Sequence, residues 1–223
     1  MAKILSMSIG KNSIHCILSG SIGNKVWVNR NGINYSRSKP VSVANPKSLA
    51  QLEHRARFTA MIKFLQPLKN FLRVGFESRT GNMSAFNAAM SCNLKMAVAG
   101  TYPEYRIDYS KVMVSRGKLP GALHPSVRLT PAGEIEFAWE NNSKAIDVGR
   151  SDDKAMLVVY NPEKQEAVTI VGGNIRITGS QVIALPSHFA GDEVQCYIGF
   201  QNLRQSEVSE SQYVGGIVVE NKE

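Results

Sequence analysis

The chain has 223 residues, of which 43% are hydrophobic and 20% are charged. These values are ordinary for a soluble globular protein and unlike those of disordered or membrane chains. No stretch approaches the roughly 18 apolar residues that a membrane-spanning helix needs, and no apolar run near the N-terminus reaches signal-peptide length. We therefore expect no membrane span and, by default, a cytoplasmic protein. Incorporation into a phage-like or exported assembly stays open as an alternative.

Charge is unevenly distributed along the sequence. Residues 1–120 contain 18 Lys and Arg against 4 Asp and Glu, a net charge of +14, whereas residues 121–223 contain 8 against 14, a net charge of −6. Such a division is typical either of two differently solvated surfaces or of a basic part that meets an acidic partner. In the second interpretation the partner is nucleic acid, an anionic surface, or the acidic half of another copy.

Residues 25–37 predict a β-hairpin. Asn31-Gly32 separates two β-rich runs, and this dipeptide favours a two-residue type I′ turn. The turn sets three cross-strand pairs: Arg30 with Ile33, Val28 with Tyr35, and Val26 with Arg37. Because a two-stranded ribbon is marginally stable alone, we expect it to pack against the following helices or another subunit.

Helices are expected after the hairpin. Asn45-Pro46 offers an N-cap followed by a proline at the first helical position, and an apolar stripe continues to Leu65. Pro67 should kink or divide this helix, because proline lacks an amide hydrogen. Another helix is expected from about Ser84 to Ala97.

From about residue 109 the sequence alternates between apolar and polar residues, as half-buried strands require. Residues 134–140 place their apolar side chains on one face, whereas residues 154–160 are apolar on both faces and suit a central strand. Further strands are expected at residues 111–115, 165–171, 181–185, 194–200 and 212–219. About seven short strands at this spacing predict an antiparallel β-sandwich.

The sequence therefore predicts an α+β protein with two domains. Residues 1–108 form a basic region with a β-hairpin and two or three helices, and residues 109–223 form the β-sandwich domain. This second part resembles a fibronectin type III or immunoglobulin-like domain. Trp139 stands where that family often carries a core tryptophan, KAMLVVYN resembles a central strand, and IALPSHFAGDEVQCYIGF resembles a leucine-proline bend and the long strand after it. Val194 falls near the place where the family has a tyrosine. The fold hosts no single function.

The whole chain is also similar to a bacterial family of domains of unknown function, chiefly from Bacteroidetes-type genomes. The segments that carry this resemblance are SGSIGNKVWV, NPKSLAQLEHRARF, FNAAMSCNLK, IDYSKVMVSRGKLPGA, DDKAMLVVYNPEK and GDEVQCYIGF. The resemblance implies no activity. The stretch from Pro40 to Phe58 also resembles an element of some phage virion proteins, which favours a role in assembly.

Patterns typical of catalytic and metal sites are missing from the sequence. The four histidines are scattered without an HExxH motif, and the three cysteines lie too far apart for a metal or redox motif. Gly20–Gly23 and Gly172-Gly173 lack the strand-to-helix context of a phosphate-binding loop. We therefore expect no enzymatic activity, no cofactor, no metal and no small-molecule substrate.

The candidate contact residues are basic and aromatic: Trp27, Arg30, Tyr35, Arg37, Lys39, Arg55, Arg57 and Lys63. The plainer interpretation is that the aromatic side chains pack and the cations only face solvent. Our leading hypothesis is a structural or interaction protein that forms a homo-oligomer or a larger assembly, with its basic part docked on an acidic surface. Such a contact generates rings or filaments. The alternative is a nucleic-acid-binding protein, in which cations contact phosphates and an aromatic ring stacks on bases.

Overall fold

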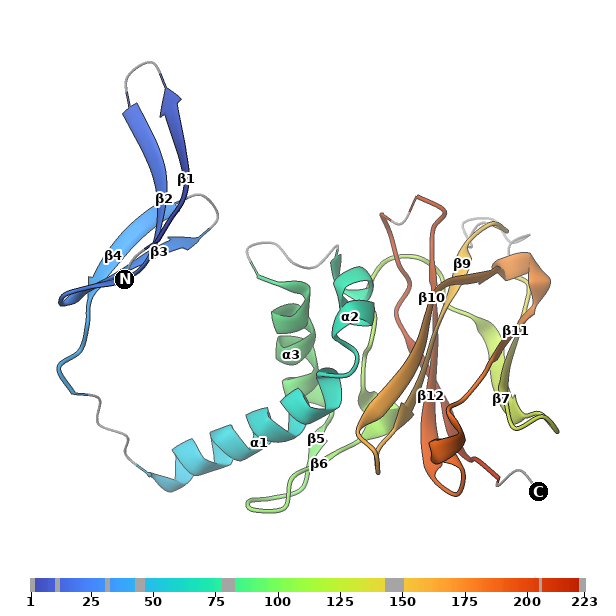
Figure 1. Cartoon of the computed structure of the whole chain (residues 1–223). Helices are drawn as coiled ribbons and strands as arrows, with labels where there is room; N and C mark the ends of the chain where they lie inside the picture. Colours follow the sequence, from blue (N-terminus) through green and yellow to red (C-terminus); the bar gives the residue numbers. More distant parts are fainter. Residues whose placement is uncertain are drawn as a thin grey trace. The chain divides into compact units, whose positions relative to one another are not determined.

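The computed structural model describes residues 3–10, 13–30, 33–42, 47–77, 83–142, 151–204 and 206–220. It divides into two compact units, which we call the N-terminal unit (residues 1–47) and the main unit (residues 48–223). The domain boundary expected after residue 108 is therefore misplaced. It falls inside the main unit, where the helices pack on the sheet that follows them in the sequence (Figure 1).

The N-terminal unit is a four-stranded antiparallel sheet in the order β1-β2-β3-β4. Its strands are β1 (Lys3–Gly10), β2 (Ser13–Ile22), β3 (Lys25–Arg30) and β4 (Ile33–Ser38). The three predicted cross-strand pairs of the β3-β4 hairpin are confirmed, while Asn31-Gly32 itself lies outside the described residues. The sequence analysis missed β1 and β2. The hairpin gains two further strands from its own unit, which meets the stability requirement of a short ribbon.

Three helices open the main unit. They are α1 (Leu49–Leu65), α2 (Lys69–Gly75) and α3 (Ala85–Met96). The N-cap of α1 is Ser48, so this helix begins later than expected, and Asn45-Pro46 lies outside the described residues. Pro67 divides α1 from α2 as predicted. The α3 helix predicted from about Ser84 to Ala97 is also confirmed. It begins after Ser84, whose hydroxyl accepts a hydrogen bond from the backbone N–H of Asn87 at 3.2 Å.

Antiparallel sheets form the rest of the main unit. One sheet has the order β10-β9-β12-β13, a second has the order β11-β8-β7, and the short strands β5 and β6 pair with each other. The bounds are β5 (Val98–Ala99), β6 (Arg106–Ile107), β7 (Leu123–Leu129), β8 (Ile135–Glu140), β9 (Lys154–Asn161), β10 (Glu166–Ile175), β11 (Ser180–Ile183), β12 (Glu193–Gln201) and β13 (Gln212–Val218).

The β9 strand is buried on both faces and divides two hydrophobic cores. Met156 and Val158 contribute to a core that they share with α1, α2 and α3. Leu157 and Val159 contribute to a second core that includes side chains of β8 and β11. Because successive side chains of a strand point to opposite faces, a strand between two cores is apolar throughout. The central strand predicted over residues 154–160 is therefore confirmed.

Residues 112–122, which we call the strap, connect the helices to the sheets without forming a helix or a named strand. The strand expected at residues 111–115 is absent, because side chains bind the strap backbone where a neighbouring strand would. The amide of Asn93 accepts the Met113 N–H at 2.8 Å and donates to the Met113 carbonyl at 2.9 Å. Gln212 makes the equivalent pair of bonds with the backbone of Ala122. Other groups of the strap bond to backbone: the Arg116 N–H donates to the Gly75 carbonyl at 2.8 Å, and the Leu119 N–H donates to the Val208 carbonyl at 3.1 Å. The strap therefore combines side-chain and backbone partners without forming a regular strand.

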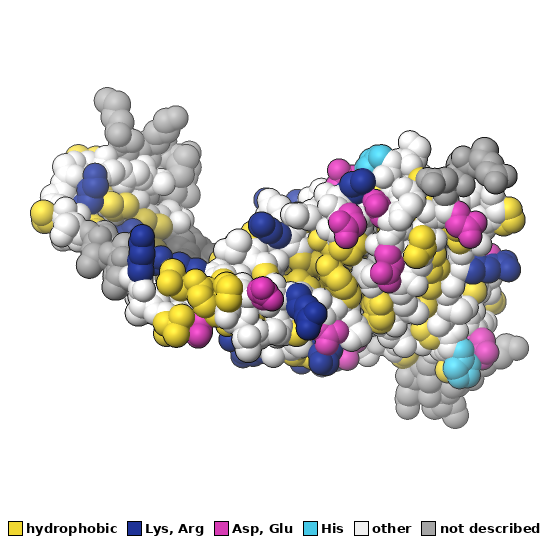
Figure 2. Space-filling view, turned by 90° about the horizontal axis from the view of Figure 1, so that it is seen from below, with side chains coloured by type: hydrophobic (Ala, Val, Ile, Leu, Met, Phe, Trp, Pro, Cys, Tyr) yellow, Lys and Arg dark blue, Asp and Glu magenta, His cyan; other side chains and the backbone are white. Residues whose placement is uncertain are grey.

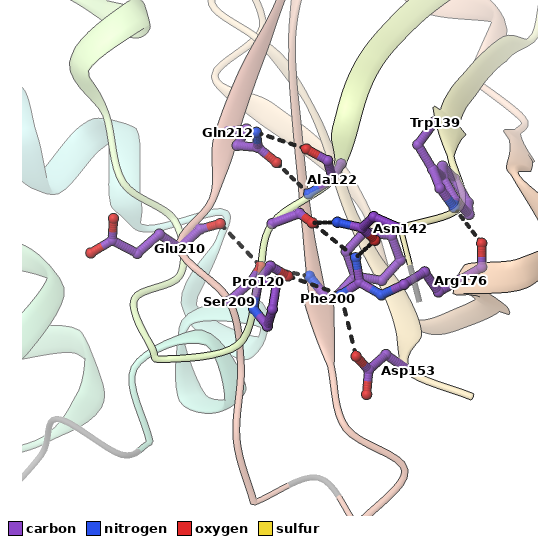
Figure 3. Close-up of polar contacts among 11 residues, drawn as sticks. Pro120, Ala122, Trp139, Asn142, Asp153, Arg176, Phe200, Ser209, Glu210 and Gln212 are labelled. Carbon is purple, nitrogen blue, oxygen red and sulfur yellow. Dashed lines mark hydrogen bonds and ion pairs between the residues drawn. The ribbon is translucent and has the colours of Figure 1, made fainter. Parts of the chain in front are cut away.

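A buried arginine fixes the end of the strap (Figure 3). The Arg176 side chain is fully buried, and its Nη2 lies 3.2 Å from Asp153 Oδ2. The same guanidinium donates to the carbonyls of Pro120 at 2.9 Å and Gly121 at 2.8 Å, and to Asn142 Oδ1 at 2.9 Å. One side chain therefore holds backbone and side-chain groups from three separate segments of the main unit.

The same arginine also packs against the second core. Its guanidinium carbon lies 3.7 Å from the centroid of the Phe200 ring, and its backbone carbonyl accepts a 2.8 Å hydrogen bond from Trp139 Nε1. Burial lowers the pKa of Arg176, and the neighbouring Asp153 carboxylate opposes that shift. This cation is therefore part of the folded interior and is not a surface contact.

Replacing Arg176 with Met should lower the free energy of unfolding by about 3 to 5 kcal/mol, because the buried carboxylate of Asp153 would lose the guanidinium that pairs with it. Urea unfolding followed by circular dichroism measures this change. The control is Arg128→Met. Arg128 pairs with Glu136, but its side chain is 76% exposed, so this substitution should lower the free energy of unfolding by at most about 1 kcal/mol. Equal effects of the two substitutions would contradict the structural role of Arg176.

Candidate interaction surface

The N-terminal unit concentrates the positive charge of the chain. Residues 1–47 contain seven Lys and Arg and no Asp or Glu, a net charge of +7, so the main unit carries only +1 of the total of +8. Figure 2 shows basic but no acidic side chains on the N-terminal unit, whereas both kinds occur on the main unit. The expectation of one basic lobe over residues 1–108 is thus corrected. The basic helices and the acidic strands belong to one unit.

The β4 strand of this basic unit is exposed along its whole length. All six of its residues are exposed, including Ile33 at 70% and Tyr35 at 44%. Among the described residues β4 pairs only with β3, so one of its edges carries backbone N–H and C=O groups without a neighbouring strand. Exposed strand edges are templates for pairing with another chain.

The structure separates the predicted contact residues of the hairpin. The β3-β4 register places Tyr35 and Arg37 on one face and Trp27 on the other. Trp27 is half-buried, while Lys39 is exposed directly after β4. The side chain of Arg30 lies outside the described residues. Tyr35, Arg37 and Lys39 are therefore the predicted contact residues of this unit that are described as exposed.

The remaining predicted contact residues lie on α1, in the main unit. Arg55, Arg57 and Lys63 are all exposed. Arg57 is engaged within its own unit: its Nη2 donates to the Leu94 carbonyl at 3.2 Å, and its guanidinium carbon lies 5.9 Å from the Tyr105 ring centroid. The eight residues thus belong to two units, and the single basic patch that the sequence suggested is divided between them.

The sequence analysis missed an apolar surface on the main unit, which we call the edge cluster. Its members are exposed aliphatic side chains of β10, β11 and the 3₁₀ turn Arg176–Thr178 between them: Val171, Ile175, Ile177 and Val182. The end of β10 lies close to the start of β11, because the side-chain amide of Asn174 donates to the Ser180 carbonyl at 2.8 Å. Each strand is an edge of its sheet among the described residues. The sequence signal was the consecutive apolar pair Ile170-Val171, which departs from alternation.

Two exposed histidines pair with carboxylates: His124 with Glu140 at 3.1 Å and His188 with Glu166 at 2.8 Å. The described residues contain no group of three His, Cys, Asp or Glu that could hold a metal ion. A cavity of about 270 Å³ is lined by Cys92, Arg116, Lys95 and neighbouring apolar side chains. The Cys92 sulfur lies 3.5 Å from Arg116 Nη1 and 3.7 Å from Met113 Sδ, so no described base adjoins it. Within the described part, no helix is long and apolar enough to cross a membrane.

Thiol reactivity should separate the two cysteines whose side chains are described. Burial raises the pKa of Cys196 to about 12, so almost none of it is thiolate near pH 8, and the thiolate is the reactive form. Cys92 is only half-buried. In a Cys16→Ser variant, Ellman's reagent should modify Cys92 at least about tenfold faster than Cys196. A Cys16→Ser, Cys92→Ser variant assigns the slow phase, which should become fast in urea. Rapid modification of Cys196 in the folded protein would contradict this burial.

Comparison with known protein families gives one match. A family model described as a family of unknown function (DUF6266) matches residues 17–215. Because this match spans most of the chain, the chain belongs to that family. No curated protein matches the chain. The match runs from β2 to β13, so the family pattern includes the β3-β4 hairpin together with the main unit.

Proposed function

We propose that this member of the family is a non-enzymatic interaction protein that assembles with further copies of itself through its N-terminal unit. The observation that carries the proposal is the exposed edge of β4 on a unit with seven cations and no acidic residue. Exposed sheet edges bind partners through backbone hydrogen bonds, and exposed cations select acidic partners.

Charge determines which surfaces of two copies attract each other. Two N-terminal units repel each other, because each carries +7. Residues 121–223, which contain all seven strands from β7 to β13, carry −6 and attract that unit. A contact between unlike surfaces leaves one free surface of each kind at the ends of the assembly. The contact therefore generates open chains, or rings where the rotation closes.

The position of three buried groups with a raised pKa supports the non-enzymatic part of the proposal. Burial raises the pKa of Tyr160 and Tyr197 well above its usual range, and it raises that of Cys196 to about 12. All three side chains lie inside the hydrophobic cores. Catalytic groups with perturbed pKa values face a cleft where substrate binds, and these groups are packed away from solvent.

We expect the protein to associate reversibly at low salt and to dissociate as salt is added, because salt screens exposed charges. Sedimentation velocity over a concentration series measures the association. Replacing Arg37 and Lys39 with Glu should weaken it about tenfold, since each exposed ion pair contributes up to about 1 kcal/mol. Glu substitutions at Lys95 and Lys118, exposed cations of the main unit, are the matched control and should leave association unchanged. A monomer at every concentration in low salt would refute self-assembly.

Nucleic-acid binding is the second candidate function. It is favoured by the absence of acidic residues from the N-terminal unit and by the position of exposed Tyr35 on the same face as Arg37. Such a surface should bind single strands with an affinity that falls steeply with salt. In a fluorescence anisotropy titration with single-stranded DNA, Tyr35→Ala should weaken binding about tenfold, because stacking contributes about 1 to 3 kcal/mol per base. Anisotropy that stays constant at low salt would exclude this function.

We also propose that strands β7 to β13 form a fibronectin type III-like sandwich. Side chains from both sheets share the second core, which includes Trp139. In immunoglobulin-like sandwiches the third, sixth and seventh strands lie in one sheet. Here the corresponding strands β9, β12 and β13 lie in the four-stranded sheet, which supports the proposal. An experimental structure tests it.

A further inference from the structure

We propose that the acceptor for the N-terminal unit is the β10 edge of a second copy, where β4 adds to the four-stranded sheet as a further strand. This inference rests on the proposed self-assembly and names the surface that binds the N-terminal unit. Among the described residues β10 pairs with β9 alone, over Glu166–Val171. Its outer edge thus carries backbone groups without a strand partner, as the outer edge of β4 does. Two such edges satisfy each other by β-augmentation.

The two edges match in length and in side-chain character. β4 has six residues, and β10 pairs with β9 over six residues before its register shifts after Val171. Ile33 and Tyr35 are exposed on β4, and the edge cluster exposes four aliphatic side chains beside β10. Aromatic and β-branched side chains form favourable cross-strand pairs. Joining the edges removes apolar surface of both copies from water.

The charges around β10 are suited to a cationic partner. Between Asn161 and Ile183, where every residue is described, the basic side chains are Lys164 and Arg176. Lys164 Nζ lies 3.4 Å from Asp192 Oδ2, and Arg176 is buried against Asp153. Both cations are thus paired within the main unit. Lys154 of β9 lies opposite Ile175, beyond the register shift of β10. Where β10 begins, Glu163 is exposed, and the exposed Glu166 lies with its Oε2 2.8 Å from His188 Nε2. This region attracts Arg37 and Lys39 of the incoming unit.

The occupant of the edge is therefore a second copy of this chain. A strand matches the alternating N–H and C=O groups along a sheet edge, and β4 combines such an edge with the complementary charge. The contact is between unlike surfaces, because β4 of one copy meets β10 of the next. Each added copy leaves a free β4 edge at one end of the chain and a free β10 edge at the other, so the assembly can add copies at both ends.

Cross-linking between two preparations tests the pairing directly. Both carry Cys16→Ser and Cys92→Ser. One adds Tyr35→Cys on β4, and the other adds Thr169→Cys, at an exposed position of β10. A short bismaleimide should link the mixture into covalent dimers that contain one chain of each preparation, while either preparation alone should give no cross-linked product. Ser126→Cys, at an exposed position of β7, replaces Thr169→Cys as the matched control and should give no product.

A pair of charge substitutions in the edge cluster gives an independent test. Ile177→Asp with Val182→Asp should weaken association at least tenfold, whereas Leu123→Asp, at an exposed aliphatic position of β7, should not. Urea unfolding midpoints confirm that each variant is folded. The wild type could associate while the Asp substitutions leave association unchanged and no cross-link forms with Thr169→Cys. In that case the β10 edge is not the acceptor, but the proposal of self-assembly stands. If the wild type never associates, both proposals fail. A further variant carries both Tyr35→Cys and Thr169→Cys. A cross-link that forms within a single chain of this variant would show that β4 of the same copy, and not of a second copy, occupies the β10 edge.

Discussion

The buried guanidinium of Arg176 is the contact on which the arrangement of the main unit depends. A charged side chain in the interior is tolerated only with a counter-charge and hydrogen-bond acceptors around it. Here Asp153 supplies the charge, and the carbonyls of Pro120 and Gly121 supply acceptors. Because those carbonyls belong to the strap, the end of the helical region is tied to the sheets by the requirement to satisfy one cation. Phe200 covers the guanidinium from the second core.

The strap explains why helices and strands of different character form one unit. Its backbone is bonded by the amides of Asn93 from α3 and Gln212 from β13, two elements far apart in the sequence. Ser211 adds a third contact, because its hydroxyl accepts the Val114 N–H at 2.9 Å. The segment that resembled its family without any simple periodicity, IDYSKVMVSRGKLPGA, is largely this strap. Side-chain partners of this kind leave no alternating pattern in the sequence.

Features set by local chemistry were predictable from the sequence, and features set by distant partners were not. The hairpin register followed from Asn31-Gly32, the division of the first helices from Pro67, and the β9 strand from its apolar residues on both faces. Residues 111–115 have the sequence pattern of a strand, but side chains bind the backbone of Met113 and Val114. In β1 and β2, polar residues mask the alternation of apolar and polar positions. The edge cluster depends on strand order, which periodicity does not encode. For the same reason, the contact residues on α1 and in the hairpin looked like one patch.

The double burial of β9 has a consequence for dissecting this chain. A fragment that starts at residue 109 retains every strand from β7 to β13 but loses the helices that cover Met156, Val158 and Tyr197. Those side chains would then form an uncovered apolar face, and such faces make isolated fragments aggregate. The sheets are therefore not an excisable module. A truncation after residue 47 falls at the boundary between the two compact units, so it leaves the packing within each unit intact.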